Sequence, residues 1–321
     1  MESPYRRDVA PACAIWTKGA AQLLDYGIGT PAAERIGSVA LFIPSLINRY
    51  YILDLEENRS MLRYMASEGI YPLVLDWGTP GPDEADYDVG AYIEQVLLPA
   101  IAFLQQTTGK PISLVGYCMG GILAMAAARL IPDAISNLSL LATPWDFHCK
   151  EFQPFVVEPQ WHKTISSLLS QGALPAEVIQ SLFYLTDPWV FEQKFRRFAQ
   201  LQADSRAAKD FIALEQWVND GVPMTAGVAQ DCLLGWVQHN QLMKNAWRVM
   251  DTVIDPRKIK TPTLIAIPRN DHVVPYDCAA ALPPLVPNAQ IMTPPAGHVG
   301  MIVGGQAKKE LWQPLVQWIA S

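Results

Sequence analysis

Residues 116–121 read Gly-Tyr-Cys-Met-Gly-Gly, so a cysteine, Cys118, stands between glycines where a reactive side chain would be well placed. The apolar run 112–117 precedes it and predicts a strand, and the run 119–130 follows it and predicts a helix. This is the strand–turn–helix context of the nucleophile elbow G-x-S-x-G, with a thiol in place of the usual serine. The other interpretation of the motif is a buried structural cysteine at the Gly-rich start of a helix.

Glycines at 116 and 120 allow a sharp backbone bend and close packing of the helix on the strand. The bend would project Cys118 above the sheet at the positive end of the helix, which favours the thiolate over the thiol. The N–H of Met119 would then point to the site where an oxyanion forms. The second oxyanion donor is expected in the loop 44–51, at the N–H of Leu46 or Ile47, of which we favour Ile47.

A nucleophile needs a base and a group that orients the base, and both occur downstream of the cysteine. Asp271 follows the predicted strand 261–268, and His298 follows the predicted strand 289–295, between glycines and before the last helix. The chain order nucleophile, acid, histidine is that of the α/β-hydrolase triad. We predict a triad in which His298 takes the proton of Cys118, while Asp271 fixes the imidazole or helps to activate an incoming hydroxyl. His272 is expected to point elsewhere.

The elements that must position these residues alternate between short apolar runs and helical patterns. Strands are predicted at 38–44, 71–77, 112–117, 137–143, 261–268 and 289–295, and helices at 59–69, 91–105, 119–130 and 306–319. Near-continuous apolar strands of this kind are typical of a parallel sheet covered on both faces. We predict one domain over 1–321 with the α/β-hydrolase fold: a mostly parallel sheet, helices on both faces, and a helical cap inserted at about 144–255.

Composition excludes several classes of function. Charged residues make up 17% of the chain, the net charge is −7, and no run rich in Lys or Arg occurs, so nucleic-acid binding is not expected. The most apolar run, 120–128, is too short to span a bilayer. Five cysteines without framework spacing fit reduced thiols, and the first residues show no secretory signal, so a cytoplasmic protein is expected. Neither a metal cluster nor a phosphate-binding loop is visible.

A thiol nucleophile has one chemical advantage over a hydroxyl. Acyl exchange between two thiols is nearly isoenergetic, so Cys118 can accept an acyl group from an acyl-CoA and remain activated enough to pass it to an alcohol. A serine would form a stable ester and lose the activation. The cysteine therefore favours a transferase that uses thioesters over a plain hydrolase.

Several blocks of the chain resemble signatures of the polyhydroxyalkanoate synthases. These blocks are PSLINRYYILDL (44–55), DWG (76–78), GYCMGG (116–121), DHVVP (271–275) and GHVG (297–300). The spacing is similar as well, over about residues 35–320, and the chain looks most like the short synthases that work with a second subunit. In this resemblance Cys118, Asp271 and His298 match the triad positions of the family.

The resemblance implies an acyltransferase that polymerises (R)-3-hydroxyacyl-CoA, releases CoA and extends a polyester on Cys118. CoA enters as a thioester substrate, and no cofactor is implied. The implied partners are a second copy of the chain and a second synthase subunit, at the surface of a polyester granule in the cytoplasm.

Two alternatives stay open. A thiol hydrolase, such as an intracellular polyhydroxyalkanoate depolymerase or a thioesterase, would use the same triad but let water resolve the acyl-enzyme. A non-catalytic granule or scaffold protein would be expected to have lost at least one triad residue, and all three are present.

Overall fold

The structure, a computed structural model, describes residues 7, 9–27, 37–150, 159–170, 172–186, 194–203 and 205–321. Its centre is an eight-stranded sheet with the order β1-β2-β6-β3-β7-β8-β11-β12. The strands are β1 (Cys13–Lys18), β2 (Ala21–Asp25), β3 (Val39–Ile43), β6 (Tyr71–Asp76), β7 (Ile112–Tyr117), β8 (Ile135–Leu141), β11 (Thr263–Ala266) and β12 (Gln290–Met292). The six strands from β6 to β12 in this order are parallel. The predicted mostly parallel sheet is confirmed.

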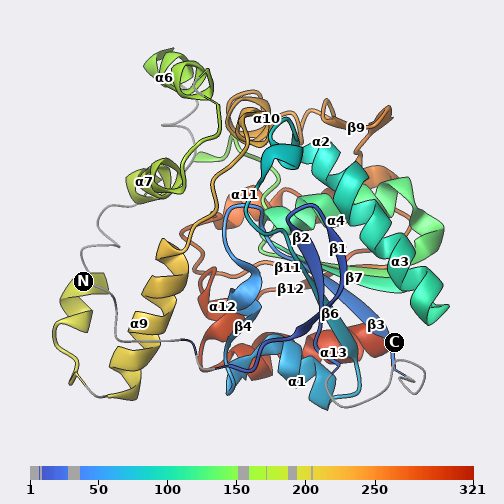
Figure 1. The fold of residues 1–321 in the computed structure, drawn as a ribbon, viewed down its shortest axis with the longest axis vertical. Helices are drawn as coiled ribbons and strands as arrows, with labels where there is room; N and C mark the ends of the chain where they lie inside the picture. The colour runs from blue at the N-terminus through green and yellow to red at the C-terminus, as the bar shows by residue number, and fades with distance from the viewer. Residues whose placement is uncertain are drawn as a thin grey trace.

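Helices cover both faces of the sheet (Figure 1). One face packs on α2 (Val89–Tyr92), η4 (Ile93–Leu97), α3 (Leu98–Thr108) and α4 (Met119–Leu130). The other face packs on α1 (Met61–Ser67), α12 (Gly300–Val303), η10 (Lys308–Trp312) and α13 (Gln313–Ala320). Strand β3 shows why both layers are needed, because Leu41 and Ile43 enter the first core while Ala40 and Phe42 enter the second. A strand buried on both faces must be apolar throughout.

The helix predicted at 119–130 has the predicted bounds, and the other three lie within three residues of theirs, with two irregularities. Helix α1 ends before Gly69, whose φ of +84° is a left-handed conformation that glycine adopts without strain. The predicted helices at 91–105 and 306–319 each contain a π-helical turn, η4 and η10, just before Pro99 and Pro314. Proline lacks the N–H that would bond to the preceding turn, which accounts for the widened turn at these positions.

The hairpin β1–β2 is an element that the sequence patterns did not reveal. Strand β2 pairs antiparallel with β6, and β1 pairs antiparallel with β2 at the edge of the sheet. Its outer strand is largely exposed, so it lacks the apolar run that marks the central strands. The hairpin extends the parallel sheet by an antiparallel edge.

The segment between β8 and β11 is mostly helical where the structure describes it. Its elements are α6 (Pro159–Leu169), α7 (Ala176–Thr186), α9 (Arg206–Asn219), α10 (Ala226–Gln230), η7 (Asp231–Gln238), β9 (Arg248–Val249) and β10 (Thr252–Val253). Residues 151–158, 171, 187–193 and 204 of the predicted cap lie outside the described residues. That 144–255 is a cap inserted in a single domain stays a prediction, and we call the described part of this segment the insert.

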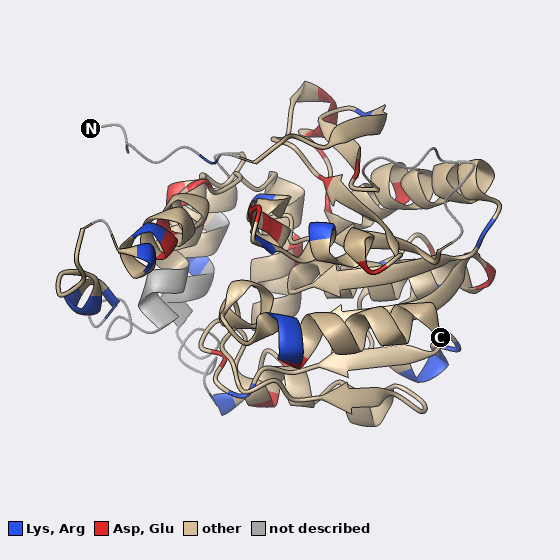
Figure 2. Ribbon diagram, turned by 90° about the horizontal axis from the view of Figure 1, so that it is seen from below, with Lys and Arg blue, Asp and Glu red and all other residues tan. Residues whose placement is uncertain are grey.

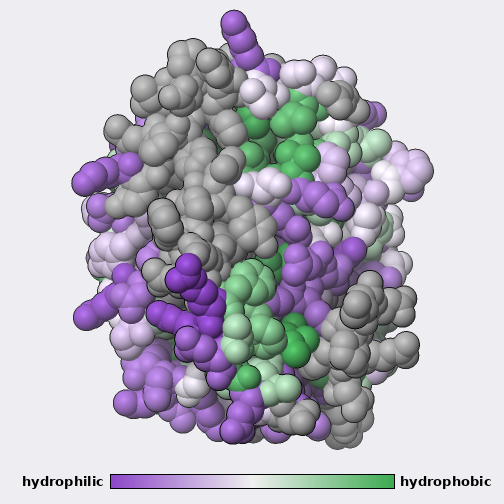
Figure 3. Space-filling model, turned by 90° about the vertical axis from the view of Figure 1, so that its left-hand side faces the viewer, coloured by the Kyte–Doolittle hydropathy of each residue, from purple (hydrophilic) through white to green (hydrophobic). Residues whose placement is uncertain are grey.

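Charged and apolar side chains are intermixed on the surface that the figures show. Figure 2 shows Lys and Arg interspersed with Asp and Glu over most of the ribbon. Figure 3 shows the side where α7 and α9 lie, on which apolar side chains reach the surface in patches between polar ones. Within the described ranges, no helix is long and apolar enough to cross a membrane. All five cysteines are free thiols.

Candidate active site

Cys118 occupies a strained turn between the end of β7 and the start of α4. Its backbone has φ 55° and ψ −127°, a region that residues other than glycine rarely adopt. Two hydrogen bonds hold the turn: the Cys118 N–H donates to the Leu141 carbonyl at 2.8 Å, and the Gly121 N–H donates to the Cys118 carbonyl at 3.0 Å. This is the geometry of a nucleophile elbow, in which strain keeps a side chain exposed above the sheet.

Glycines are required around this turn because the backbone segments approach too closely for a side chain. A Cβ at Gly116 would collide with the backbone of Gly121, and a Cβ at Gly120 would collide with the carbonyl of Ile43. The predicted role of these two glycines in packing α4 against the strands is therefore confirmed by the contacts.

The N-terminus of α4 faces the Cys118 side chain. Cys118 is the N-cap residue and Met119 is the first residue of this 12-residue helix. The N–H groups of a first helical turn have no acceptor within the helix, and they carry the positive end of the helix dipole. Negative charge on the sulfur or on an oxygen beside Met119 is stabilised there.

Asp271 and His298 come together in the loops that follow β11 and β12. Nδ1 of His298 lies 2.7 Å from Oδ2 of Asp271. The other carboxylate oxygen, Oδ1, accepts the N–H groups of Val273 and Val274, both at 2.8 Å. The Asp271 side chain is fully buried, so these three bonds fix its orientation and compensate its charge. The His298 imidazole is thereby held with Nδ1 directed toward Asp271.

The protonation of His298 reflects competing effects. Burial lowers its pKa, but the negative charges of Asp271 and Cys118 and the hydrogen bonds to both outweigh burial and raise the pKa from 6.5 to about 10. Asp271 and Cys118 thus act on the same imidazole, Asp271 through its contact with Nδ1. The arrangement favours the imidazolium form of His298.

Tyr117, which precedes Cys118, contacts His298 through its ring and its hydroxyl. Its ring lies 5.1 Å from the His298 ring, centroid to centroid, and its hydroxyl donates to the His298 carbonyl at 3.3 Å. Burial raises the pKa of Tyr117 well above its usual value, so the phenol stays neutral beside the charged ring. The sequence does not mark Tyr117 as functional, because an aromatic side chain at the end of a buried strand gives no functional signal.

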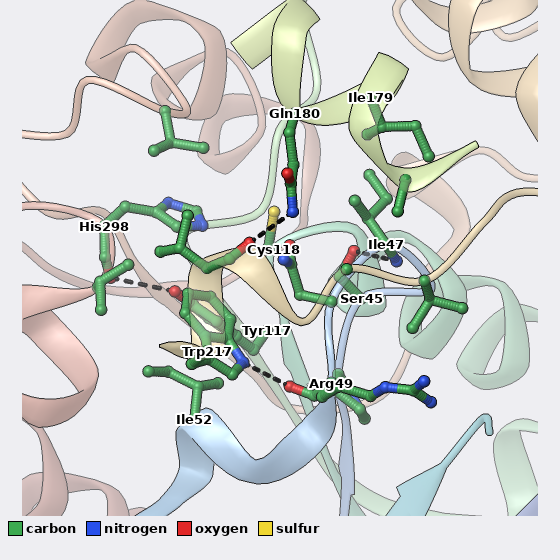
Figure 4. Close-up of a pocket in the computed structure, with 18 of the residues that line it drawn as sticks. Ser45, Ile47, Arg49, Ile52, Tyr117, Cys118, Ile179, Gln180, Trp217 and His298 are labelled. Atoms are coloured by element: carbon green, nitrogen blue, oxygen red, sulfur yellow. Dashed lines mark hydrogen bonds between the residues drawn. The ribbon is translucent and has the colours of Figure 1, made fainter. Parts of the chain in front are cut away.

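Two cavities meet at Cys118. The larger, of about 330 Å³, is lined by Cys118, His298 and Arg49, which Figure 4 labels. Lys194 lines it as well. The smaller, of about 140 Å³, is lined almost wholly by apolar side chains from the elbow and the insert, among them Trp236. Ile47 lines both cavities. Both cations are ion-paired, Arg49 with Asp220 at 3.4 Å and Lys194 with Glu215 at 2.6 Å. The sulfur therefore lies between a cavity lined by paired charges and an apolar recess.

The loop 44–51 is attached to the insert by backbone and side-chain bonds. The Val222 N–H donates to the Ile47 carbonyl at 2.9 Å, and the Trp217 indole donates to the Arg49 carbonyl at 2.8 Å. The Tyr51 hydroxyl donates to Asp220 at 2.9 Å. The position of this loop over Cys118 thus depends on residues about 170 positions later in the chain.

The N–H of Ile47 does not point freely to the cysteine in this structure. It donates to Oγ of Ser45 at 3.1 Å, as Figure 4 shows. Ile47 lies at the predicted place beside Cys118, but its N–H must leave Ser45 before it can serve an oxyanion. Its role, like that of Met119, stays a prediction.

Residues that line the larger cavity include some that the sequence did not single out. His272 is exposed and lines this cavity rather than pointing elsewhere. Gln180, from α7, also lines it and donates to the Val218 carbonyl at 2.8 Å. Gln180 comes from the insert, which carries no motif, so only the folded chain reveals it. Within the described ranges, no group of three or more His, Cys, Asp or Glu side chains is placed to hold a metal ion.

Sequence comparisons agree with this geometry. Residues 75–305 match the profile of the family described as alpha/beta hydrolase fold, and residues 9–65 match the profile of the poly-beta-hydroxybutyrate polymerase (PhaC) N-terminus. Three relatives are named poly(3-hydroxyalkanoate) polymerase subunit PhaC. The protein of Allochromatium vinosum is 26% identical and covers 97% of this chain and 88% of its own. That of Haloferax mediterranei is 26% identical and covers 87% and 58%, and that of Synechocystis is 24% identical and covers 87% and 77%.

Solved structures show the same architecture at low identity. A monoacylglycerol lipase of Paleococcus ferrophilus has a TM-score of 0.59 at 14% identity, covering 94% of this chain and 98% of its own. The non-heme bromoperoxidase BpoC of Mycobacterium tuberculosis, so described, has a TM-score of 0.57 at 16% identity, covering 96% and 98%. The predicted resemblance to the polyhydroxyalkanoate synthases is confirmed by the relatives and the PhaC profile. The chain belongs to the α/β-hydrolase fold family, and within that family its sequence is similar to the PhaC polymerase subunits.

Proposed function

We propose that the protein is an acyltransferase that polymerises (R)-3-hydroxyacyl-CoA through a covalent thioester on Cys118. The observation that carries this proposal is the strained elbow with a thiol, beside a histidine bonded to a buried carboxylate, in a chain similar to PhaC subunits along nearly its whole length. The proposed catalytic residues are Cys118, His298 and Asp271.

In the first half-reaction the Cys118 thiolate attacks the carbonyl carbon of the acyl-CoA. The new C–S bond forms as the carbonyl becomes an oxyanion, and collapse of this intermediate breaks the bond to the CoA sulfur. The departing thiolate takes the proton of the His298 imidazolium and leaves as CoA. The raised pKa of His298 means that this proton is already present in the resting enzyme at neutral pH.

The oxyanion is proposed to be stabilised by two backbone donors. The Met119 N–H, at the first position of α4, is available for this role. The Ile47 N–H would exchange its bond to Ser45 Oγ for a bond to the oxyanion, which requires only a local adjustment of the loop. Such an adjustment on substrate binding gives the transition state a bond that the resting site lacks.

In the second half-reaction a hydroxyl group attacks the acyl group held on Cys118. His298, neutral after the loss of its proton, accepts the hydroxyl proton while Asp271 stabilises the imidazolium that forms again. A new ester bond replaces the thioester, and Cys118 is released as a thiolate. A thioester is less stable than an oxygen ester, so the equilibrium of this step favours the polymer.

The two cavities suit the two parts of the substrate. The phosphates of CoA are proposed to lie at the larger cavity beside Arg49 and Lys194, whose partners in the resting protein are Asp220 and Glu215. The apolar surroundings of Cys118 keep water from resolving the acyl-enzyme. A cofactor is not part of this chemistry, because the thioester itself provides the activation.

Protein partners are proposed from the relatives. Because these are named as subunits, we propose that this chain also works with a second subunit, and that it assembles as a homodimer at the surface of the polyester granule in the cytoplasm. Light scattering of the purified chain, alone and together with the second subunit, measures the molar mass and so tests both proposed assemblies.

The activity is tested by incubating purified protein with (R)-3-hydroxybutyryl-CoA and measuring free CoA together with the acyl product. We expect CoA release with insoluble polyester, lost in Cys118→Ala and retained in Cys13→Ala, which removes an exposed thiol far from the elbow. CoA release with only free hydroxy acid would instead identify a hydrolase. No CoA release, with any acyl length and with the partner subunit supplied, would reject the proposal.

A further inference from the structure

A groove of about 820 Å³, separate from the two cavities at Cys118, lies at the end of the strands opposite the active site. Cys118, Asp271 and His298 follow the C-terminal ends of β7, β11 and β12. The groove is lined instead by residues at the N-terminal ends of β11 and β12, such as Thr263 and Gln290. Because these strands are parallel, the groove lies at their N-terminal ends and the active site at their C-terminal ends. Its volume is in the range of small-molecule sites, which hold roughly 300–1,000 Å³.

The lining of the groove carries a strong local excess of positive charge. Its cations are Arg129, Arg257, Lys258 and Lys260, and the residues that line it include no Asp or Glu. Asp255 is bonded to Arg257 at 2.8 Å, and its charge also interacts with Lys258. Over the part of the chain that the structure describes, neither Arg129 nor Lys260 forms an ion pair. In a chain of net charge −7, such a cluster is an exception that favours an anion.

Three residues that line the groove each contain a buried polar atom without a hydrogen-bond partner among the described residues. Nε of Arg129 and Nε1 of Trp318 are buried and lack a hydrogen-bond partner within the described ranges. Both residues line the groove. The hydroxyl of Thr261, a residue only 6% exposed, is likewise buried without a partner in this wall. Buried polar groups without partners are rare in folded proteins, because each costs about 1–3 kcal/mol.

We propose that this groove binds a phosphate-bearing small molecule of about nucleotide size. A planar guanidinium and ammonium groups match phosphate oxygens, and the indole of Trp318 offers a surface on which a heterocyclic base can stack. The groove has room for more than one phosphate. Trp318 belongs to the last turn of α13, beside the C-terminus marked in Figure 2.

The groove is connected to the nucleophile through a single helix. Arg129 is in the last turn of α4, and Cys118 caps the first turn of the same helix. A 12-residue helix is about 18 Å long, so a ligand in the groove cannot touch the acyl group. The site is therefore separate from the proposed CoA site, and its test does not depend on the acyltransferase activity.

The test is isothermal titration of the full chain with pyrophosphate and with ADP at low ionic strength. We expect both to bind, and the double variant Arg129→Gln/Lys260→Gln to weaken both by at least about 10-fold. The matched control is Lys18→Gln/Lys309→Gln, which removes the same charge from other surfaces and should bind as the wild type does. Thermal melting and circular dichroism confirm that each variant is folded.

Further variants separate the two sources of the phosphate chemistry. If the ligand is a nucleotide, ADP binds more tightly than pyrophosphate, and Trp318→Leu weakens ADP alone. If it is a phosphate without a base, the two probes bind alike and Trp318→Leu has no effect on either. Absence of binding by wild type at millimolar concentrations, or equal weakening by the Lys18/Lys309 control, would overturn the proposal.

Discussion

The indole Nε1 of Trp217 donates a hydrogen bond to the carbonyl oxygen of Arg49, 2.8 Å away, and so attaches the insert to the loop above the nucleophile. This loop also contains Ile47, whose carbonyl accepts the N–H of Val222 from the same part of the insert. A residue 168 positions away thus helps to hold the loop that carries Ile47, the proposed second oxyanion donor. Effects on activity should therefore exceed effects on stability when this bond is removed.

The first prediction concerns Trp217→Phe. Phenylalanine keeps most of the apolar contacts of this buried residue but removes the indole donor, so the free energy of unfolding should fall by about 1–3 kcal/mol. CoA release should fall by about 10-fold or more in kcat, because the loop loses its position in the transition state. Thermal melting and steady-state kinetics measure the two effects.

Trp312→Phe is the matched control for this prediction. Trp312 is equally buried, at 6% exposure, and its indole donates to the Ile302 carbonyl at 3.0 Å, a bond that joins η10 to α12 and not to the loop 44–51. Its substitution should cost similar stability and leave kcat unchanged. Equal losses of activity in both variants would show that Trp217 acts only through general stability.

The second prediction concerns Asp271→Asn. The amide oxygen can still accept the N–H groups of Val273 and Val274, so the loop should keep its shape. The negative charge that raises the pKa of His298 is lost, and burial should then lower this pKa. We expect CoA release to fall by roughly 10²–10⁴-fold with an unchanged melting profile. Asp277→Asn, at an exposed position six residues later, should behave as wild type; wild-type activity of Asp271→Asn would contradict the triad.

The third prediction is the pH dependence of His298. Its pKa in the folded protein is about 10, above its ordinary value of 6.5. The charged histidine therefore contributes stability that is complete below pH 6.5 and is lost as the pH rises through 10. NMR titration of the imidazole nitrogens should show a midpoint near 10, absent in His298→Gln. A midpoint near 6.5 would show that the ion pair with Asp271 does not form in solution.

The fourth prediction concerns Asp231, at the start of η7. Burial raises its pKa from 3.8 to about 6, against the lowering effect of the hydrogen bond from the Val89 N–H. The contribution of this group to stability is thus present below pH 3.8 and lost as the pH rises through 6. Asp231→Asn should increase the free energy of unfolding by about 1–3 kcal/mol at pH 7.5 and have little effect at pH 4.

Chemical denaturation at the two pH values measures the effect of Asp231→Asn. Asp133→Asn, at an exposed position, serves as the control and should change little at either pH. A loss of stability in Asp231→Asn at pH 7.5 would mean that the carboxylate is better compensated than its burial indicates.

Local patterns in the sequence were sufficient for the elbow and for the order of the triad. The run from Ile112 to Leu130 forms strand, turn and helix where the pattern predicts, because each part follows from residues adjacent in the chain. The positions of Asp271 and His298 follow from the rule that loops after parallel strands meet at one edge of the sheet. Their contact at 2.7 Å was therefore predictable in kind.

Features that depend on contacts distant in sequence were not predictable. The bond between Trp217 and Arg49 joins residues 168 positions apart, and no motif marks either partner for it. The edge hairpin β1–β2 is half exposed and lacks a long apolar run. The Ile47 N–H was expected at the oxyanion, but the hydroxyl of Ser45, two residues earlier, accepts it in the resting site.

The most direct test of the proposed mechanism is intact-protein mass spectrometry after rapid mixing with (R)-3-hydroxybutyryl-CoA and acid quenching. The mechanism predicts a protein that gains one or more 3-hydroxybutyryl groups, with peptide mapping placing them on Cys118 and with the adduct absent in Cys118→Ala. CoA release by wild type without any acyl group on Cys118, or an adduct that persists in Cys118→Ala, would contradict the thioester intermediate.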